Sequence, residues 1–310
     1  MQYRTLGRTG LTVSILSQGG AALGQQYGSV SQAQAEECVR LAVDAGVNLI
    51  DTSAYYGKGL AETMLGRMLP AIGRDRVYLC TKAGRFDTHQ FDFTPAAIER
   101  SLDESLDRLG TDHVDILLAH DIEFADDIEA VFEETAACLH RLKRHGKCRF
   151  IGMSAYPPRL LVRAIERCEL DVVISYGHYT LQSQRLLDEL LPVAERHGVG
   201  ILNGSPLCLG ALSDHGPPAW HPADAEFKAV CARAVAYCRA KGADPNLLGM
   251  HFALAEERIA STITGTAKAS ELAVNLLALS TSPDQALLQE VRDILAPIRN
   301  RDWPSGKHHQ

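Results

Sequence analysis

The sequence predicts a (β/α)8 barrel, in which eight parallel strands alternate with helices. Short apolar runs rich in β-branched residues alternate with segments of helical periodicity along most of the chain, and eight such units can be counted. The length of 310 residues lies within the range of a one-domain barrel, so we expect residues 1–310 to form a single domain. No G-x-G-x-x-G motif follows the first strand, which disfavours the competing open, doubly wound sheet.

The first elements show how local signals set the predicted boundaries. Residues 3–13 alternate around a glycine-containing turn, which predicts an N-terminal β-hairpin. Residues 32–45 carry apolar side chains at helical spacing and are followed by Gly46, a favoured residue just beyond a helix end. A later helix is opened by Thr94 as N-cap and Pro95 at the first helical position.

The same signals place the remaining elements in order. Strands are expected at 14–20, 49–51, 77–82, 114–119, 149–154, 171–175, 199–204 and 261–265. Barrel helices are expected at 32–45, 59–69, 94–109, 127–145, 157–167 and 183–197. After an irregular insertion at 205–223, further helices are expected at 225–241, 245–255, 268–279 and 284–296, and the last of these form C-terminal extra helices before the tail.

Composition favours a small-molecule substrate. A formal net charge of −7 and the lack of a basic block argue against a nucleic-acid partner. The N-terminus has no apolar export segment and no window approaches a membrane span, so we expect no membrane contact and a cytoplasmic location. The eight cysteines show no C-x-x-C spacing, so reduced thiols and no metal site are expected. We expect a monomer or a weak homodimer.

Three predicted strands end in polar residues that could meet. Asp51 ends the apolar run at 49–51, and Tyr56 follows it in the next loop. Lys82 ends the strand at 77–82, and His120 follows the strand at 114–119. Because the carboxyl ends of parallel strands lie on one side of a barrel, we expect these four side chains to converge there.

This set of residues suits the interconversion of a carbonyl and an alcohol. An ammonium beside the phenol of Tyr56 favours its phenolate, and a buried Asp51 can hold Lys82 charged and in place. A neutral His120 can donate a hydrogen bond to the substrate oxygen while Tyr56 moves the proton. Each residue alone also has an ordinary structural interpretation, such as a turn cap or a solvated lysine, and only the joint pattern favours catalysis.

The motifs that carry these residues resemble those of the aldo-keto reductase superfamily. The stretches DTSAYYG, VYLCTK and DILLAH are similar to the family's motifs, and the resemblance extends through SPL at 205–207 to Asn275. It implies a (β/α)8 barrel and a catalytic tetrad at Asp51, Tyr56, Lys82 and His120.

Further stretches resemble one group within that superfamily. HDIEF, SYGHYTL, GPPAWHPA and the terminal WPSG are similar to L-galactose dehydrogenases, which implies oxidation of the anomeric carbon of a sugar with NAD. The alternatives are an aldose 1-dehydrogenase acting on L-fucose or related D-threo-aldoses, and a pyridoxal 4-dehydrogenase. A non-enzymatic barrel that senses a nucleotide is a further alternative, which the intact tetrad disfavours.

The resemblance also implies the cofactor residues. Aligned on Asn275, the positions that bind a 2′-phosphate in NADPH-dependent members are Gly265, Thr266 and Glu271. A glutamate repels a phosphate but can accept a hydrogen bond from a ribose hydroxyl, so NAD is expected. In the alternative, Glu271 is solvated and Lys268 takes the phosphate.

At the nicotinamide end the sequence departs from the family pattern. Ser154 is kept, but its neighbouring asparagine is Ala155, and Tyr176 stands where a glutamine is expected. The tyrosine that stacks on the nicotinamide in many members is replaced by Gly204, and Tyr176 is a candidate to take over part of that role. The remaining expected contacts are backbone amides in the pyrophosphate loop, at Ser205, Leu207 and Gly210.

The loops above the strand ends are expected to form the sugar pocket. A sugar has apolar faces and a rim of hydroxyls, which suits aromatic walls with a few polar groups. The expected substrate residues are Tyr55, Glu123, Phe124, His178, Trp220 and Trp303. In the alternative, Trp303 only packs the C-terminal tail against the barrel.

Overall fold

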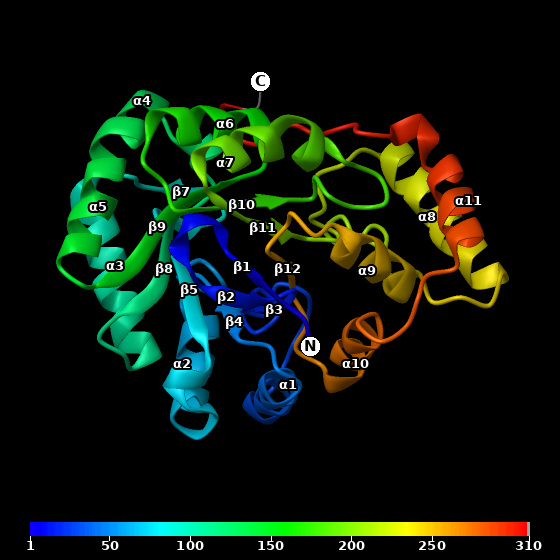
Figure 1. Ribbon diagram of the computed structural model, residues 1–310, viewed down its shortest axis with the longest axis horizontal. Coiled ribbons are helices and arrows are strands. Elements are labelled where there is room, and N and C mark those ends of the chain that lie inside the picture. Colours follow the sequence, from blue (N-terminus) through cyan, green and yellow to red (C-terminus); the bar gives the residue numbers. More distant parts are fainter. Residues whose placement is uncertain (309–310) are drawn as a thin grey trace.

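A computed structural model describes residues 1–308 and has a closed barrel of parallel strands at its centre (Figure 1). The barrel strands are β3 (Leu16–Gly19), β4 (Leu49–Asp51), β5 (Tyr78–Ala83), β8 (Val114–Ala119), β9 (Cys148–Ala155), β10 (Val172–Tyr176), β11 (Gly200–Gly204) and β12 (Ser261–Thr264). Around the barrel they follow the order β10-β11-β12-β3-β4-β5-β8-β9, with every neighbouring pair parallel. The predicted (β/α)8 fold is confirmed.

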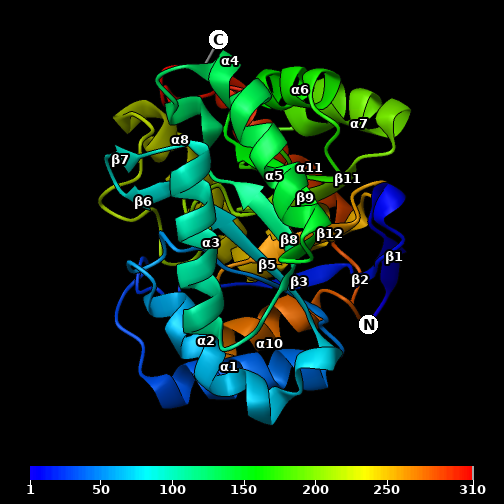
Figure 2. The ribbon, with the colours of Figure 1, turned by 90° about the vertical axis from the view of Figure 1, so that its left-hand side faces the viewer.

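Helices surround this barrel (Figure 2). They are α1 (Gln32–Asp44), α2 (Leu60–Ile72), α3 (Pro95–Leu109), α4 (Ile128–Ala130), α5 (Ala136–Arg144), α6 (Pro158–Arg167), α7 (Leu191–His197), α8 (Ala225–Ala240), α9 (Pro245–Ala255), α10 (Ala269–Leu277) and α11 (Gln285–Ile294). Short π-helical stretches at Val131–Thr135 and Leu186–Leu190 lead into α5 and α7. The second helix, expected at about 59–69, extends to Ile72, and Pro70 lies in its last turn, where the missing N–H of proline leaves one intrahelical hydrogen bond unmade.

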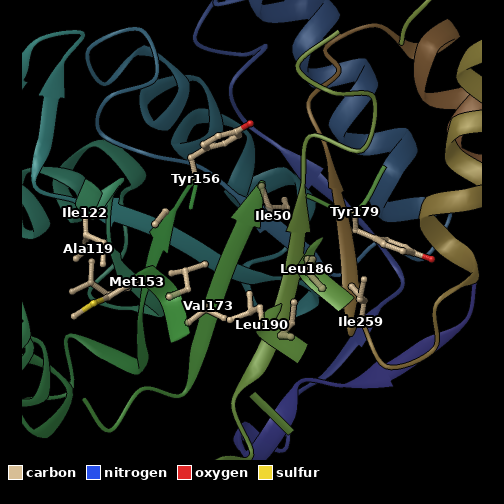
Figure 3. Close-up of a cluster of buried hydrophobic side chains, with 14 of the residues drawn as sticks. Ile50, Ala119, Ile122, Met153, Tyr156, Val173, Tyr179, Leu186, Leu190 and Ile259 are labelled. Atoms are coloured by element: carbon tan, nitrogen blue, oxygen red, sulfur yellow. The ribbon is translucent and has the colours of Figure 1, made fainter. Parts of the chain in front are cut away.

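Two apolar layers hold the barrel together. Side chains that point away from the barrel axis pack against the helices, and Figure 3 shows part of this layer, including Ile50, Ala119, Met153 and Val173. Side chains on the alternate positions fill the barrel interior and form a separate cluster. This division follows from the two-residue period of a strand, which sends successive side chains to opposite faces.

The N-terminal hairpin closes one end of the barrel. Strands β1 (Tyr3–Thr5) and β2 (Thr12–Ser14) pair antiparallel, as predicted, and Leu6, Leu11 and Val13 from this hairpin join the interior cluster. The opposite end, where the strands finish, is bordered by the connecting loops and by a small second hairpin. That end is where functional sites of such barrels lie.

Two features at the open end were not predicted. Strands β6 (Arg85–Asp87) and β7 (Gln90–Phe91) form a second small hairpin directly after β5, and it is too short to give a periodic pattern. At the other side of the molecule α8 packs against α11, so the helix that follows the insertion and the C-terminal helix form one extra layer (Figure 1). Within the described residues, no helix combines the length and apolarity that crossing a membrane requires.

Candidate active site

The two-residue period of the strands brings the predicted catalytic residues together. Leu49, Cys80 and Leu118 lie in the interior cluster, so the residue two positions after each also points toward the barrel axis. Those residues are Asp51, Lys82 and His120. The last apolar layer of the barrel therefore lies directly beneath a polar layer at its open end.

Lys82 connects Asp51 with Tyr56. Its Nζ donates to Asp51 Oδ1 at 2.7 Å, to the carbonyl of Thr52 at 2.8 Å and to Tyr56 Oη at 3.3 Å. Burial disfavours the ammonium, but Asp51, with smaller contributions from Tyr56 and Cys80, more than offsets this, and the pKa of Lys82 is raised. Burial also raises the pKa of Tyr56, and Lys82 opposes that rise. The ammonium thus favours the phenolate as predicted, although burial dominates in the absence of ligand.

His120 lies beside Tyr56 and is neutral. Its ring packs edge-on against the Tyr56 ring, with centroids 5.7 Å apart. Its Nδ1 lies 2.8 Å from Ser53 Oγ, a contact that the sequence did not suggest. Burial lowers the pKa of His120 to about 3, and Lys82 and Arg85 act in the same direction while Asp121 opposes them. A neutral imidazole can donate a hydrogen bond to a substrate oxygen without carrying charge.

A buried ion pair that sequence reasoning missed lies next to His120. The guanidinium of Arg85, the first residue of β6, donates to Asp121 Oδ2. Asp121 has a left-handed backbone, with φ of 55°, and its N–H donates to Ser154 Oγ at 3.0 Å. Ser154, expected at the cofactor, therefore also fixes Asp121. The position of Asp121 directly after His120 was the one signal for this pair in the sequence.

Aromatic side chains enclose the guanidinium of Arg85. The guanidinium lies 3.7 Å from the centroid of Tyr55, and Phe91 and Phe124 stack on each other beside it with centroids 4.5 Å apart. Tyr55 and Phe124, both expected at the substrate, are partly exposed here. This places an aromatic wall with a cationic centre at one side of the tetrad.

Glu123 is fully buried and accepts hydrogen bonds from three neighbouring groups. Its Oε1 accepts hydrogen bonds from Tyr176 Oη at 2.9 Å, from Ser305 Oγ at 3.1 Å and from the N–H of Tyr156 at 3.2 Å. No cation pairs with it among residues 1–308, and burial together with the charge of Asp121 raises the pKa of Glu123 to about 8. Glu123 thus fixes the phenol of Tyr176, the residue proposed at the nicotinamide end.

Two further residues expected at the substrate, His178 and Trp303, are buried in contacts that involve the C-terminal tail. His178 has no exposed surface, and its ring lies between the carbonyl of Tyr176 and Asp302 of the tail. Trp303 is 5% exposed, stacks on Tyr156 at 4.7 Å and contacts the edges of His221 and Phe227. These contacts support the alternative in which Trp303 packs the tail against the barrel.

Trp220, in contrast, lies on the surface of the open end. Its side chain is 50% exposed, its Nε1 donates to the carbonyl of Gln26 at 3.3 Å, and its ring packs edge-on against Tyr27. The insertion at 205–223 is thereby joined to the loop that follows β3. Trp220 borders the open end of the barrel, and within residues 1–308 its hydrogen bond and ring contact go to Gln26 and Tyr27 and not to the tetrad.

The loop after β11 presents backbone donors. Ser205, Cys208 and Leu209 all have left-handed backbones, with φ of 54°, 54° and 51°. Within residues 1–308 no backbone carbonyl accepts from the N–H groups of Leu207 and Leu209. Successive turns with free N–H groups form a concave anion site, which supports the expected contacts through Ser205 and Leu207. The N–H of Gly210, also expected there, instead donates to the carbonyl of Leu207 at 3.1 Å.

The start of α10 carries the other expected cofactor residues. Glu271 accepts a hydrogen bond from Thr266 Oγ1 at 2.7 Å and from Lys268 Nζ at 3.1 Å, so Lys268 is already paired. Asn275 lies buried one turn further along the helix, and Gly265 is exposed, with only the Cβ of Ala21 within contact distance, 3.9 Å, of where a Cβ would stand. No side chain caps the first turn, so the helix N-terminus offers its own N–H groups.

Comparison with known proteins places this site in a family. Residues 16–296 match the model of the aldo/keto reductase family. The chain is 41% identical to an L-galactose dehydrogenase of Arabidopsis thaliana, over 99% of this chain and 98% of the relative. It is 30% identical to a D-arabinose 1-dehydrogenase of Saccharomyces cerevisiae, over 96% and 95%. An aldo-keto reductase structure from Bacillus halodurans, in its holo form, shares the fold over 100% of both chains, with a TM-score of 0.79 and 23% identity. The chain belongs to the aldo/keto reductase family.

Proposed function

We propose that this protein oxidises the anomeric C1 hydroxyl of an aldose to the aldonolactone with NAD, with L-galactose as the favoured sugar. The observation that carries the proposal is the hydrogen-bonded chain from Asp51 through Lys82 to Tyr56, with neutral His120 beside it. Similarity to two sugar 1-dehydrogenases supports the substrate class.

In this proposal some residues bind the sugar oxygen and others transfer its proton. The C1 hydroxyl of the sugar would lie between Tyr56 and His120, whose rings already face each other edge to face. His120 donates a hydrogen bond to that oxygen and fixes its position. The Tyr56 oxygen accepts the hydroxyl proton, and the ammonium of Lys82 stabilises the phenolate needed for this step. Asp51 keeps Lys82 charged.

The residues around the open end fit a nicotinamide dinucleotide. When bound, this cofactor would supply the oxidising power by accepting a hydride, one proton with two electrons, from C1. The free N–H groups of Leu207 and Leu209 would hold its pyrophosphate. A Cβ at Gly204 would stand 3.0 Å from the Cβ of Tyr176, closer than ordinary contact, so Tyr176 packs directly against this glycine at the end of β11. The phenol of Tyr176 is held by Glu123.

Electrostatics at the start of α10 support NAD over NADP. A 2′-phosphate would bring negative charge close to the carboxylate of Glu271, and the nearby ammonium of Lys268 is already neutralised by that carboxylate. A ribose 2′-hydroxyl can instead donate a hydrogen bond to Glu271. This arrangement disfavours the alternative in which Lys268 binds the phosphate, because the ion pair between Lys268 and Glu271 would first have to break.

Initial-rate assays test the proposal directly. L-galactose, L-fucose, D-arabinose and pyridoxal are each offered with NAD and with NADP, and reduced cofactor is followed by its absorbance. We expect the highest kcat/KM with L-galactose and NAD, and Tyr56→Phe to lower kcat by roughly 10² or more with the fold intact. The absence of any sugar oxidation, or a Tyr56→Phe variant with near-normal kcat, would refute the proposal.

A further inference from the structure

The buried pair Arg85–Asp121 lies next to His120, and it has no assigned role. We propose that Arg85 is a positioning residue: it holds the carboxylate of Asp121 so that His120 stays neutral and keeps its Nε2–H free for the substrate oxygen. The use of that N–H rests on the proposed function, whereas the effect of Arg85 on His120 is a property of the free protein.

The hydrogen bonds of Ser53 assign the proton of His120 to Nε2. Ser53 Oγ accepts from the N–H of Tyr55 at 3.1 Å, and its other contact is His120 Nδ1 at 2.8 Å. Within residues 1–308 the Ser53 hydroxyl makes no hydrogen bond to any other acceptor, so donation to Nδ1 is the arrangement that satisfies its hydrogen, and it leaves Nδ1 unprotonated. The neutral ring then carries its hydrogen on Nε2.

Asp121 is a competitor for that hydrogen. Its Oδ2 lies 3.6 Å from His120 Nε2, slightly beyond hydrogen-bond distance. A free carboxylate at this position would capture the Nε2–H and favour the imidazolium, since an opposite charge this close raises the pKa of a histidine by about 1 to 3 units. Arg85 donates to the same Oδ2 and so occupies the oxygen that faces His120. Because Asp121 is paired with Arg85, it does not form an ion pair with His120.

The structure holds Arg85 in this position from several sides. Its side chain is 15% exposed, and its guanidinium lies 3.7 Å from the centroid of Tyr55 with Phe91 and Phe124 further out. Ser154 fixes Asp121 through the backbone N–H. With both partners immobilised, the ion pair cannot open without loss of these aromatic contacts.

The other charged and titratable groups around His120 do not perform this function. They come from β4 and the loop after it, from β5 and from the chain after β8, and they are Asp51, Tyr55, Tyr56, Lys82 and Asp121. Lys82 is bound to Asp51 and Tyr56 and makes no hydrogen bond to Asp121 within residues 1–308. Arg85 is thus the cation in direct contact with the Asp121 carboxylate, which would otherwise bind the Nε2–H of His120.

Titration of His120 in the cofactor-free protein tests the proposal without any substrate. Histidine labelled with ¹³C in the ring is observed by NMR from about pH 4.5 to about pH 9, with a His120→Asn variant to assign the signal. In the wild type the His120 signal should not titrate in this range. In Arg85→Met it should move toward the imidazolium shift as the pH falls, with a pKa raised by about 1 to 3 units. Arg85→Lys, which keeps the cation, should restore most of the wild-type behaviour.

A double variant separates the electrostatic role from loss of packing. In Arg85→Met with Asp121→Asn, the cation and the carboxylate are both gone, so the His120 signal should again be independent of pH. The kcat/KM for the sugar should fall roughly 10- to 100-fold in Arg85→Met at neutral pH and recover roughly tenfold in the double variant. An Arg85→Met protein that is folded by circular dichroism and has an unchanged His120 titration would overturn the proposal. So would a double variant whose His120 titrates like that of Arg85→Met. Failure of sugar oxidation alone would refute the proposed function and leave the titration result standing.

Discussion

Replacement of Glu123 by glutamine should remove a strong pH dependence of stability. The carboxyl group is fully buried, its Oε1 accepts hydrogen bonds from Tyr176, Ser305 and Tyr156, and its Oε2 has no partner among residues 1–308. Burial, helped by the negative charge of Asp121, raises the pKa of Glu123 from its ordinary value of 4.5 to about 8. Glu123→Gln keeps the shape of the group and fixes it in the uncharged form.

The size of the effect follows from the pKa difference. Between its ordinary pKa and about 8 the folded protein keeps the Glu123 proton, whereas the unfolded chain has lost it. The folded state therefore binds more protons in this window, and the free energy of unfolding must fall as pH rises through it. A rise from 4.5 to about 8, at about 1.4 kcal/mol per unit, gives a loss on the order of 5 kcal/mol.

Urea unfolding at about pH 5 and at about pH 8.5 measures this loss for both proteins. Because the other titrating groups are common to both, the difference between wild type and Glu123→Gln isolates this carboxyl group. We expect the variant to gain stability relative to the wild type by several kcal/mol from the lower to the higher pH, whatever its stability at the lower pH. Parallel pH profiles for the two proteins would show that Glu123 is ionised in the folded state and would refute the reasoning.

Three further predictions follow from the site. Lys82→Met should raise the pKa of Tyr56 further, so the acid limb of kcat/KM for oxidation should move to higher pH; an unmoved limb in an active variant would contradict the role of Lys82. The wild type should prefer NAD by at least roughly tenfold in kcat/KM, and Glu271→Arg should narrow this preference; equal use of both cofactors by the wild type would contradict the alignment on Asn275. Trp303→Ala should lower the free energy of unfolding by about 3 to 5 kcal/mol and leave the KM for the sugar nearly unchanged, as expected for a buried packing residue. A marked rise in KM at unchanged stability would show instead that Trp303 lines the sugar pocket.

The fold and the tetrad could be read from the sequence because both follow from local periodicity. Each strand of the barrel is a short run with a clear boundary, and the polar residue that ends the run marks the open end. Asp51, Lys82 and His120 all follow interior apolar residues by two positions, so one pattern indicates both the strand and the direction of its last side chain. Side-chain chemistry then indicated a role for each of the four residues, and the resemblance added the expected cofactor positions.

Contacts between distant segments could not be predicted in this way. The hydrogen bond from Ser305 to Glu123 and the stacking of Trp303 on Tyr156 join the tail to loops more than a hundred residues away. A sequence motif identifies Trp303 as part of a tail but does not show which surface buries its ring. Arg85 was missed because it begins a hairpin of only a few residues, where neither strand alternation nor helical spacing can be recognised.

The register of the barrel couples its core to its chemistry. Because side chains alternate along a strand, a slip of β5 by one residue would turn Lys82 outward and bring Ala83 to the axis, away from both Asp51 and Tyr56. The same slip would move Cys80 out of the interior cluster and bring Leu79 into it, so the apolar packing resists it. The apolar layer beneath the site thus fixes which polar side chains face one another. The ion pair of Arg85 with Asp121 lies beyond the last barrel residues, where register no longer controls direction, and there the left-handed backbone of Asp121 and the aromatic ring of Tyr55 do so instead.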